Sequence, residues 1–210
     1  MNEVKPADLL DRTAKIISVI FHPIFIPLYG LTLIFSVPTI YSYLSLPVKN
    51  LLFIMVLINN IILPLILISF LKAKKIISSW EMEDRSERML PLFFATVLYA
   101  VTSYIIIKYP TPIFIKTYFI SIVFVASVVT VINNWWKISI HSTASGALTA
   151  LALILSFRMY NVIIFPLIAV VIIAGLMLSS RLRLNSHTPA QVWLGFLVGF
   201  IVLGVFYKMV

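Results

Sequence analysis

Long apolar runs alternate with short polar segments along the whole chain. Each run is close to the roughly 20 residues that a helix needs to cross the hydrocarbon core of a bilayer. The apolar runs cover these ranges: Lys15 to Phe35, Lys49 to Leu71, Leu90 to Lys108, Ile113 to Ile132, Ser142 to Phe157, Val162 to Leu178 and Gln191 to Tyr207. In lipid, an isolated run satisfies its own backbone polar groups only as a helix. The pattern predicts an all-α bundle of about seven transmembrane helices, with six as the alternative, in one membrane domain over residues 1–210.

Two of the predicted spans contain prolines, which are expected to kink their helices. Pro23 and Pro27 fall in the first span and Pro64 in the second. Proline has no backbone N–H, so each removes one helical hydrogen bond. We expect kinks at these positions and no chemistry from them.

The polar segments are distributed unequally between the two ends of the predicted bundle. Successive spans alternate in direction, so the segments after the second, fourth and sixth spans open on the same face of the membrane. These segments hold most of the polar chemistry: Trp80 to Pro91, Asn133 to His141 and Ser179 to Gln191. The sequence therefore predicts a composite site at one end of the bundle.

Composition excludes several classes of protein. The chain is 61% hydrophobic and 11% charged, whereas soluble domains are about 45–50% apolar and about 25% charged. The net charge of +9 comes from 16 Lys and Arg residues spread over short loops, which is typical of membrane proteins and excludes a nucleic-acid partner. With no cysteine in the chain, disulfides and iron–sulfur clusters are excluded. We expect an integral protein of a bacterial inner (cytoplasmic) membrane.

The three polar segments together offer guanidinium, imidazole, ammonium and hydroxyl groups. Guanidinium groups bind phosphate through paired hydrogen bonds, and histidine acts as nucleophile or general acid near neutral pH. The candidate residues on this face are Arg85, Arg88, Lys137, Ser139, His141, Arg181, Arg183 and His187. Their chemistry indicates a phosphoryl group as the guest.

The third segment carries the strongest family resemblance. Ser180-Arg181, followed after five residues by His187, resembles the third motif of the type 2 phosphatidic acid phosphatase and vanadium haloperoxidase superfamily. In that family the motif continues with three residues and an aspartate. This chain has Gln191 at the aspartate position.

The other two segments resemble the family's remaining motifs more weakly. Ser139-Ile140-His141 is similar to the second motif, Ser-Gly-His at the start of a helix, with isoleucine in place of glycine. The first motif, a lysine with six residues before Arg-Pro, is echoed only by Arg85, Arg88 and Pro91. The resemblance covers residues 80–205.

The resemblance implies a metal-independent membrane phosphatase with no cofactor. His187 would attack phosphorus and form a phosphohistidine, and His141 would protonate the leaving alcohol. The implied phosphate ligands are Arg181, Arg88, Arg85, Ser139 and Lys137. The substrate would be a lipid phosphate or diphosphate, such as a phosphatidyl phosphate, a polyprenyl diphosphate or lipid A. Membrane lipids are the expected surroundings, and no obligatory protein partner is expected.

Gln191 departs from the family pattern in a chemically important way. An aspartate would orient the nucleophilic imidazole and stabilise its positive charge, whereas an amide oxygen orients it without adding charge. The first polar segment holds four carboxylates that could supply the missing charge: Glu81, Glu83, Asp84 and Glu87.

Alternatives of other classes remain open on sequence alone. The first is a non-catalytic binder or transporter of lipid phosphates on the same fold, which the missing aspartate favours. The second is a haem protein with His141 and His187 as the two axial ligands, which a Soret band would reveal. His22, inside the first span, is interpreted as a histidine hydrogen-bonded within the bundle, and Arg183 as a membrane anchor.

Overall fold

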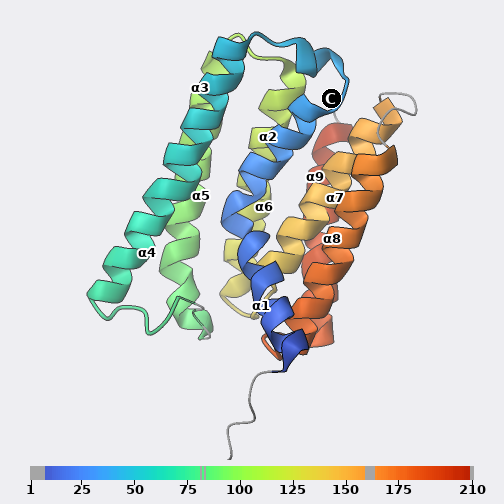
Figure 1. Ribbon diagram of the computed structural model, residues 1–210. Coiled ribbons are helices and arrows are strands. Elements are labelled where there is room, and N and C mark those ends of the chain that lie inside the picture. The colour runs from blue at the N-terminus through green and yellow to red at the C-terminus, as the bar shows by residue number, and fades with distance from the viewer. Residues whose placement is uncertain (1–7, 81, 83, 159–163, 209–210) are drawn as a thin grey trace, which may run out of the picture.

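The computed structural model describes residues 8–80, 82, 84–158 and 164–208, which are mainly helical (Figure 1). The elements are α1 (Leu9–Ile20), η1 (Pro23–Phe25), α2 (Ile26–Ser36), η2 (Ile40–Tyr43), α3 (Leu46–Val56), the π-helix η3 (Leu57–Ile62), α4 (Leu63–Ala73), α5 (Arg85–Lys108), α6 (Ile113–Asn133), α7 (Ile140–Arg158), α8 (Ile164–Arg183) and α9 (Pro189–Lys208). The described ranges contain seven spans that are long and apolar enough to cross a membrane. The predicted all-α transmembrane bundle is confirmed.

The outer surface of the bundle is apolar, as a protein in lipid requires. Large hydrophobic side chains are exposed on most of the spans, among them Phe70, Phe93, Tyr104, Phe124, Ile172 and Leu197. Monomeric soluble proteins rarely expose so much contiguous apolar surface. The chain is an integral membrane protein.

Helix α7 lies at the centre of the C-terminal half of the bundle. In its most apolar window 67% of the residues are buried, and the next highest share is 44%, in α6. It contacts α2, α6, α8, α9 and η1. Its buried residues are mostly small, and small side chains let neighbouring helices approach closely. The position of α7 therefore determines where the second polar segment lies.

The contact between α7 and α9 depends on glycine. A Cβ atom at Gly199 would overlap the carbonyl oxygen of Thr143, and a Cβ atom at Gly146 would overlap the carbonyl oxygen of Phe196. Gly195 and Gly199 are four residues apart on the face of α9 that meets α7, a spacing that favours close helix packing in membranes. This contact holds the second and third polar segments side by side.

We expect Gly199→Ala to destabilise the bundle. The added methyl group would also lie 2.9 Å from the backbone nitrogen of Ala147, so α7 and α9 would have to separate, at a cost of about 1–3 kcal/mol. Thermal unfolding of the purified protein in detergent measures the effect. The matched control is Gly204→Ala on the same helix, where a Cβ atom meets nothing within 4 Å. Equal unfolding temperatures for the two variants would contradict this account.

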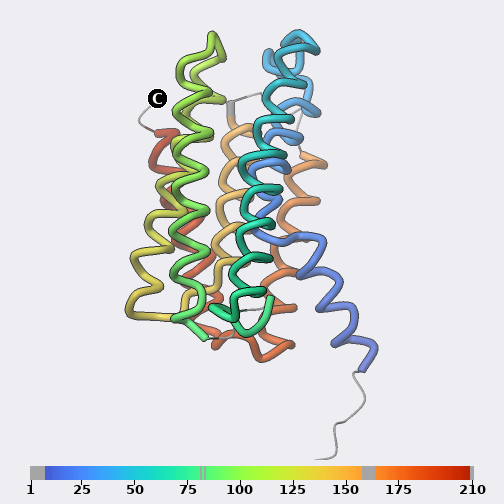
Figure 2. Tube along the Cα trace, turned by 90° about the vertical axis from the view of Figure 1, so that its left-hand side faces the viewer, coloured from blue at the N-terminus to red at the C-terminus, as the bar shows by residue number. Residues whose placement is uncertain are grey.

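The first span is broken rather than kinked. The expected span begins at Lys15, but α1 begins at Leu9 and ends at Ile20, and a short 3-10 helix starts at Pro23 before α2 continues. The change of direction between α1 and α2 is visible in Figure 2. Pro23 thus has a larger effect than the predicted kink, because it separates two helices. In the second span, Pro64 lies in the first turn of α4, directly after η3.

The three polar segments meet at one end of the bundle, as predicted. The links α4–α5, α6–α7 and α8–α9 all lie at the lower end in Figure 1, together with the start of α1. Arg183 joins α8 to α1 there through Asp8 at 2.9 Å and Asp11 at 2.7 Å. These ion pairs give Arg183 structural partners at the start of α1, and its interpretation as a membrane anchor stays a prediction.

Candidate functional site

Ser139 determines where α7 begins. Its Oγ accepts hydrogen bonds from the backbone N–H of Ser142 at 3.4 Å and from the Ser142 hydroxyl at 2.9 Å. A serine at this position satisfies a backbone donor in the first turn of the helix. Ser139 is fully buried and its oxygen faces α7, so its bond to a phosphate stays a prediction. What it does in the structure is place His141 in the first turn.

Thr188 and Gln191 form a capping box at the start of α9. The Gln191 backbone N–H donates to the Thr188 hydroxyl at 3.4 Å, and the Thr188 backbone N–H donates to Gln191 Oε1 at 3.2 Å. Threonine followed three residues later by glutamine is a sequence signature of a helix start. Gln191 therefore has a structural role at the start of α9, which the sequence analysis missed.

The same Gln191 side chain orients His187. Oε1 of Gln191 lies 3.1 Å from Nδ1 of His187. Because that atom also accepts from the Thr188 N–H, it is the carbonyl oxygen, and His187 must be the donor. The proton therefore lies on Nδ1, and Nε2 carries the lone pair. The predicted orienting contact between these two residues is present.

Cationic side chains from three segments lie within electrostatic range of His187. Burial first, and then the charges of Arg88, Arg181 and Lys137, lower the pKa of the His187 imidazole to about 4, against the hydrogen bond with Gln191, which raises it. The side chain is 7% exposed. His187 is therefore neutral at pH 7, the form in which Nε2 can act as a nucleophile.

His141 lies on the inner side of this cluster. Arg181 and His187 are within electrostatic range of it, and its ring forms a hydrogen bond with the backbone of Ser18 in α1. The His22 ring stands edge-on to the His141 ring, with centroids 5.1 Å apart and an angle of 88°. The two predicted histidines are thus brought together, with a third beside them.

The predicted phosphate ligands divide into two groups. Arg88 is buried and its Nε donates to the carbonyl of Met82 at 2.6 Å, and Arg181 donates from Nη1 to the Ser18 hydroxyl at 3.5 Å. Both act on His187 through their charge, as does Lys137. Arg85 instead is exposed at the first residue of α5, and no described contact joins its guanidinium to the histidines.

A pocket opens beside His187 at the end of the bundle. Its volume is about 490 Å³, which is within the usual range for small-molecule sites. It is lined by Lys137, Asn185, Ser186, His187, Thr188, Pro189 and Gln191. A phosphate group in this pocket would meet the Lys137 ammonium and the His187 imidazole together.

The carboxylates of the first polar segment do not replace the missing aspartate within the described part of the chain. Glu87 accepts hydrogen bonds from the backbone N–H and the hydroxyl of Ser78, each at 3.0 Å, and Asp84 is exposed before α5. Glu81 and Glu83 lie outside the described residues. The side chain that contacts Nδ1 of His187 is the uncharged amide of Gln191.

His22 and Ser18 are the site residues that sequence reasoning left out. His22 was interpreted as a bundle histidine without a role in the site, yet it contacts His141. The available signal was an ionisable residue in the middle of a span, which is rare enough in membranes to indicate function. Loop positions alone did not reveal it, because alternation of direction locates loops and not the rotation of a helix.

Among the described residues, no group of three His, Cys, Asp or Glu side chains is arranged to hold a metal ion. Comparison of the chain with protein-family models, with curated proteins and with solved structures finds no match.

Proposed function

We propose that this chain is a membrane phosphatase, related to the type 2 phosphatidic acid phosphatase superfamily, that hydrolyses a lipid phosphate or diphosphate through a phosphohistidine. One observation carries the proposal. The neutral His187 is held by Gln191 at 3.1 Å among Arg88, Arg181 and Lys137, with His141 within electrostatic range. This arrangement combines a nucleophile, an acid and a cationic environment.

In the first step, the lone pair on His187 Nε2 attacks phosphorus. The bond between phosphorus and the ester oxygen breaks, and the leaving oxygen takes a proton from His141, giving the free lipid alcohol. For a lipid diphosphate, the leaving group is the lipid monophosphate. Cations placed around the transferring group stabilise its charge, the task that metal ions perform in many phosphoryl-transfer enzymes.

In the second step, water attacks the phosphohistidine. His141, now neutral, accepts a proton from the water, the bond between nitrogen and phosphorus breaks, and its electron pair returns to His187. Inorganic phosphate leaves, and both histidines regain their starting states. Proton transfer by a positioned side chain accelerates such steps by about 10²–10⁴-fold.

The position of the site supports a lipid substrate. The pocket lies where α9 begins and the α8–α9 link meets the second polar segment, at the end of an apolar bundle, so a phosphate head group reaches it while its chains stay in lipid. The proposal includes the cytoplasmic membrane of a bacterium, because spanning proteins of the bacterial outer membrane are β-barrels and the described spans here are helical.

Phosphate release from a panel of lipid phosphates by the purified chain tests this function. We expect release, and a radiolabelled phosphoryl group trapped on His187 that is stable in alkali and labile in acid, as a nitrogen–phosphorus bond is. Binding of lipid phosphates without any release would indicate the binder or transporter, which the amide at Gln191 favours. Neither binding nor release would rule out both functions.

A further inference from the structure

The break in the first span releases a backbone carbonyl next to the site. In an unbroken helix, the His22 N–H would donate to the carbonyl of Ser18. Here the His22 N–H donates to the carbonyl of Val19 at 3.3 Å instead, while the Phe21 N–H donates to the carbonyl of Ile17 at 3.0 Å. Pro23 contributes no N–H to the helix. The Ser18 carbonyl is therefore available to a partner outside α1.

That partner is His141. Its ring hydrogen-bonds to the backbone of Ser18, where the released carbonyl is the acceptor. The Ser18 hydroxyl accepts a bond from Arg181 at 3.5 Å, so one residue contacts two members of the site. Ser18 is 7% exposed, which keeps water from competing for either bond.

His22 supports the same arrangement from the other side of the break. Its Nδ1 accepts a hydrogen bond from the Ile24 N–H at 3.3 Å, which caps η1 and places the ring proton on Nε2. Because the ring is fixed in this way, its edge-on contact with His141 restricts rotation of the His141 ring.

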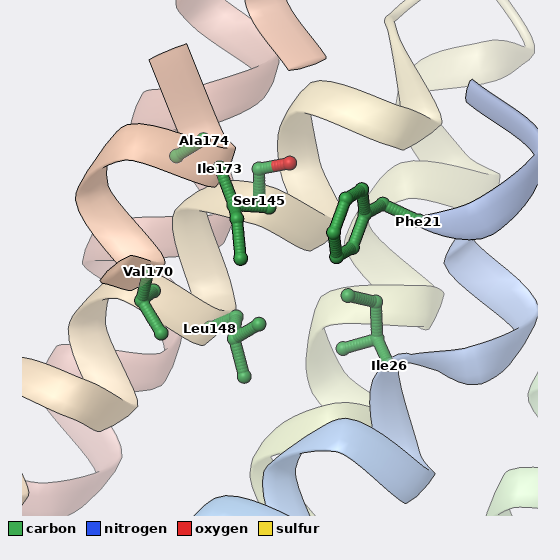
Figure 3. Close-up of a pocket in the computed structure, with 7 residues that line it drawn as sticks. All are labelled: Phe21, Ile26, Ser145, Leu148, Val170, Ile173 and Ala174. Carbon is green, nitrogen blue, oxygen red and sulfur yellow. The ribbon is translucent and has the colours of Figure 1, made fainter. Parts of the chain in front are cut away.

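The break is also held against α7 and α8 by apolar contacts. In Figure 3, Phe21 and Ile26 from the two sides of the break face Ser145 and Leu148 of α7 across a small gap. The gap has a volume of about 10 Å³, room for about one water molecule. The Ser145 hydroxyl donates to the carbonyl of His141 at 3.0 Å, so the contact lies one turn from the site.

We propose that the broken first span is part of the active site, in which the Ser18 carbonyl and the His22 ring are positioning groups that hold His141 in the orientation for protonating the leaving oxygen. With one ring nitrogen bound to Ser18, the other nitrogen is left to exchange a proton with the substrate. Among the described residues, the charged or titratable groups that face His141 are Arg181 from α8, His22 from the break between α1 and η1, and His187 from the α8–α9 link. This inference rests on the proposed phosphatase function.

The dependence on the leaving group tests the inference. An alkyl phosphate needs its leaving oxygen protonated, whereas a nitrophenyl phosphate leaves readily without an acid. Pro23→Ala restores an N–H and lets α1 continue, which returns the Ser18 carbonyl to the helix. His22→Asn keeps a side chain that can cap η1 but removes the ring. We expect both variants to lose about 10–100-fold in kcat on the alkyl substrate and no more than about 3-fold on the aryl substrate.

Tyr29→Phe is the matched control. The Tyr29 hydroxyl donates to the carbonyl of Ile20 at 2.6 Å, another carbonyl at the same break, and no described contact joins it to His141. Its effects on the two substrates should be equal. Equal losses on both substrates in Pro23→Ala and His22→Asn, or no loss in either, would overturn the inference and leave the phosphatase function standing.

Nitrogen NMR of labelled histidines separates this inference from the phosphatase function itself. The His141 ring signal of the full chain should shift in Pro23→Ala and not in Tyr29→Phe. An unchanged His141 signal in Pro23→Ala overturns the inference whatever the turnover. A wild type without release on either substrate overturns the phosphatase function and, with it, the protonating task assigned here to His141.

Discussion

Replacing His187 with alanine is expected to reduce phosphate release by at least about 10⁴-fold, as loss of a nucleophile does in other enzymes with covalent intermediates. His187 carries the lone pair on Nε2, because its Nδ1 proton is directed at Gln191. Among the described residues, His187 is the imidazole that lines the pocket. The measurement is steady-state phosphate release from the best substrate of the panel, together with the loss of the trapped phosphoryl group.

Trp193→Phe on the same helix serves as the control for purification and folding, because Trp193 is 57% exposed on the outside of α9. His141→Ala should fall less, by about 10²–10⁴-fold, since it removes proton transfer and leaves the nucleophile. Equal release by wild type, His187→Ala and His141→Ala would mean that neither histidine takes part in the chemistry.

The fold was predictable because lipid leaves so few solutions for an apolar chain. The length of the apolar runs and the need to satisfy backbone polar groups in lipid predict about seven helices, and the described residues contain seven. The start of the first span was less predictable. Asp11 lies inside α1 and pairs with Arg183 at 2.7 Å. Because that partner is 172 residues away in the sequence, the polar residues around Asp11 gave no local sign that the helix already includes them.

The alternation of helix directions predicted which polar segments share one end of the bundle, but not which of their side chains meet. That alternation placed His141 and His187 on one face, where both lie within electrostatic range of Arg181. It did not distinguish Arg88 from Arg85, because both lie in the same polar segment. Which of the two side chains is buried depends on how α5 is rotated about its axis. Arg88 is buried and Arg85 is exposed.

The contribution of α1 was not predictable in this way. Its contact with the site depends on which carbonyl the break at Pro23 releases and on the packing of α1 against α8. Both are tertiary features. The capping role of Gln191 was different, since the spacing from Thr188 is a local signal that the sequence already contains.

Gln191→Glu is expected to raise kcat by about 10²–10⁴-fold, the reverse of the loss seen when a supporting carboxylate is replaced by an amide in a serine protease. Glutamate has nearly the shape of glutamine, so its oxygen can keep both contacts of the amide oxygen, at 3.1 Å to His187 Nδ1 and 3.2 Å to the Thr188 N–H. Glutamate also fits the capping box. The new charge would stabilise the positive imidazole that forms as His187 bonds to phosphorus.

The pH dependence of kcat/KM gives this prediction a second, independent readout. A protonated His187 has no lone pair on Nε2, so activity is lost as the pH falls through its pKa. In the wild type that pKa is about 4, lowered first by burial. A carboxylate beside Nδ1 favours the charged form and raises the pKa of His187 toward the ordinary 6.5, so the acid limb should move to higher pH in Gln191→Glu.

The two readouts together separate the enzyme from its rival. Gln191→Met is the control, because it keeps the length of the side chain and removes the acceptor, and both rate and helix capping should fall. A shifted acid limb with an unchanged rate would mean that His187 titrates but is not the nucleophile. If the wild type binds lipid phosphates without turnover and Gln191→Glu hydrolyses them, the amide is what makes the natural protein a binder on a phosphatase framework.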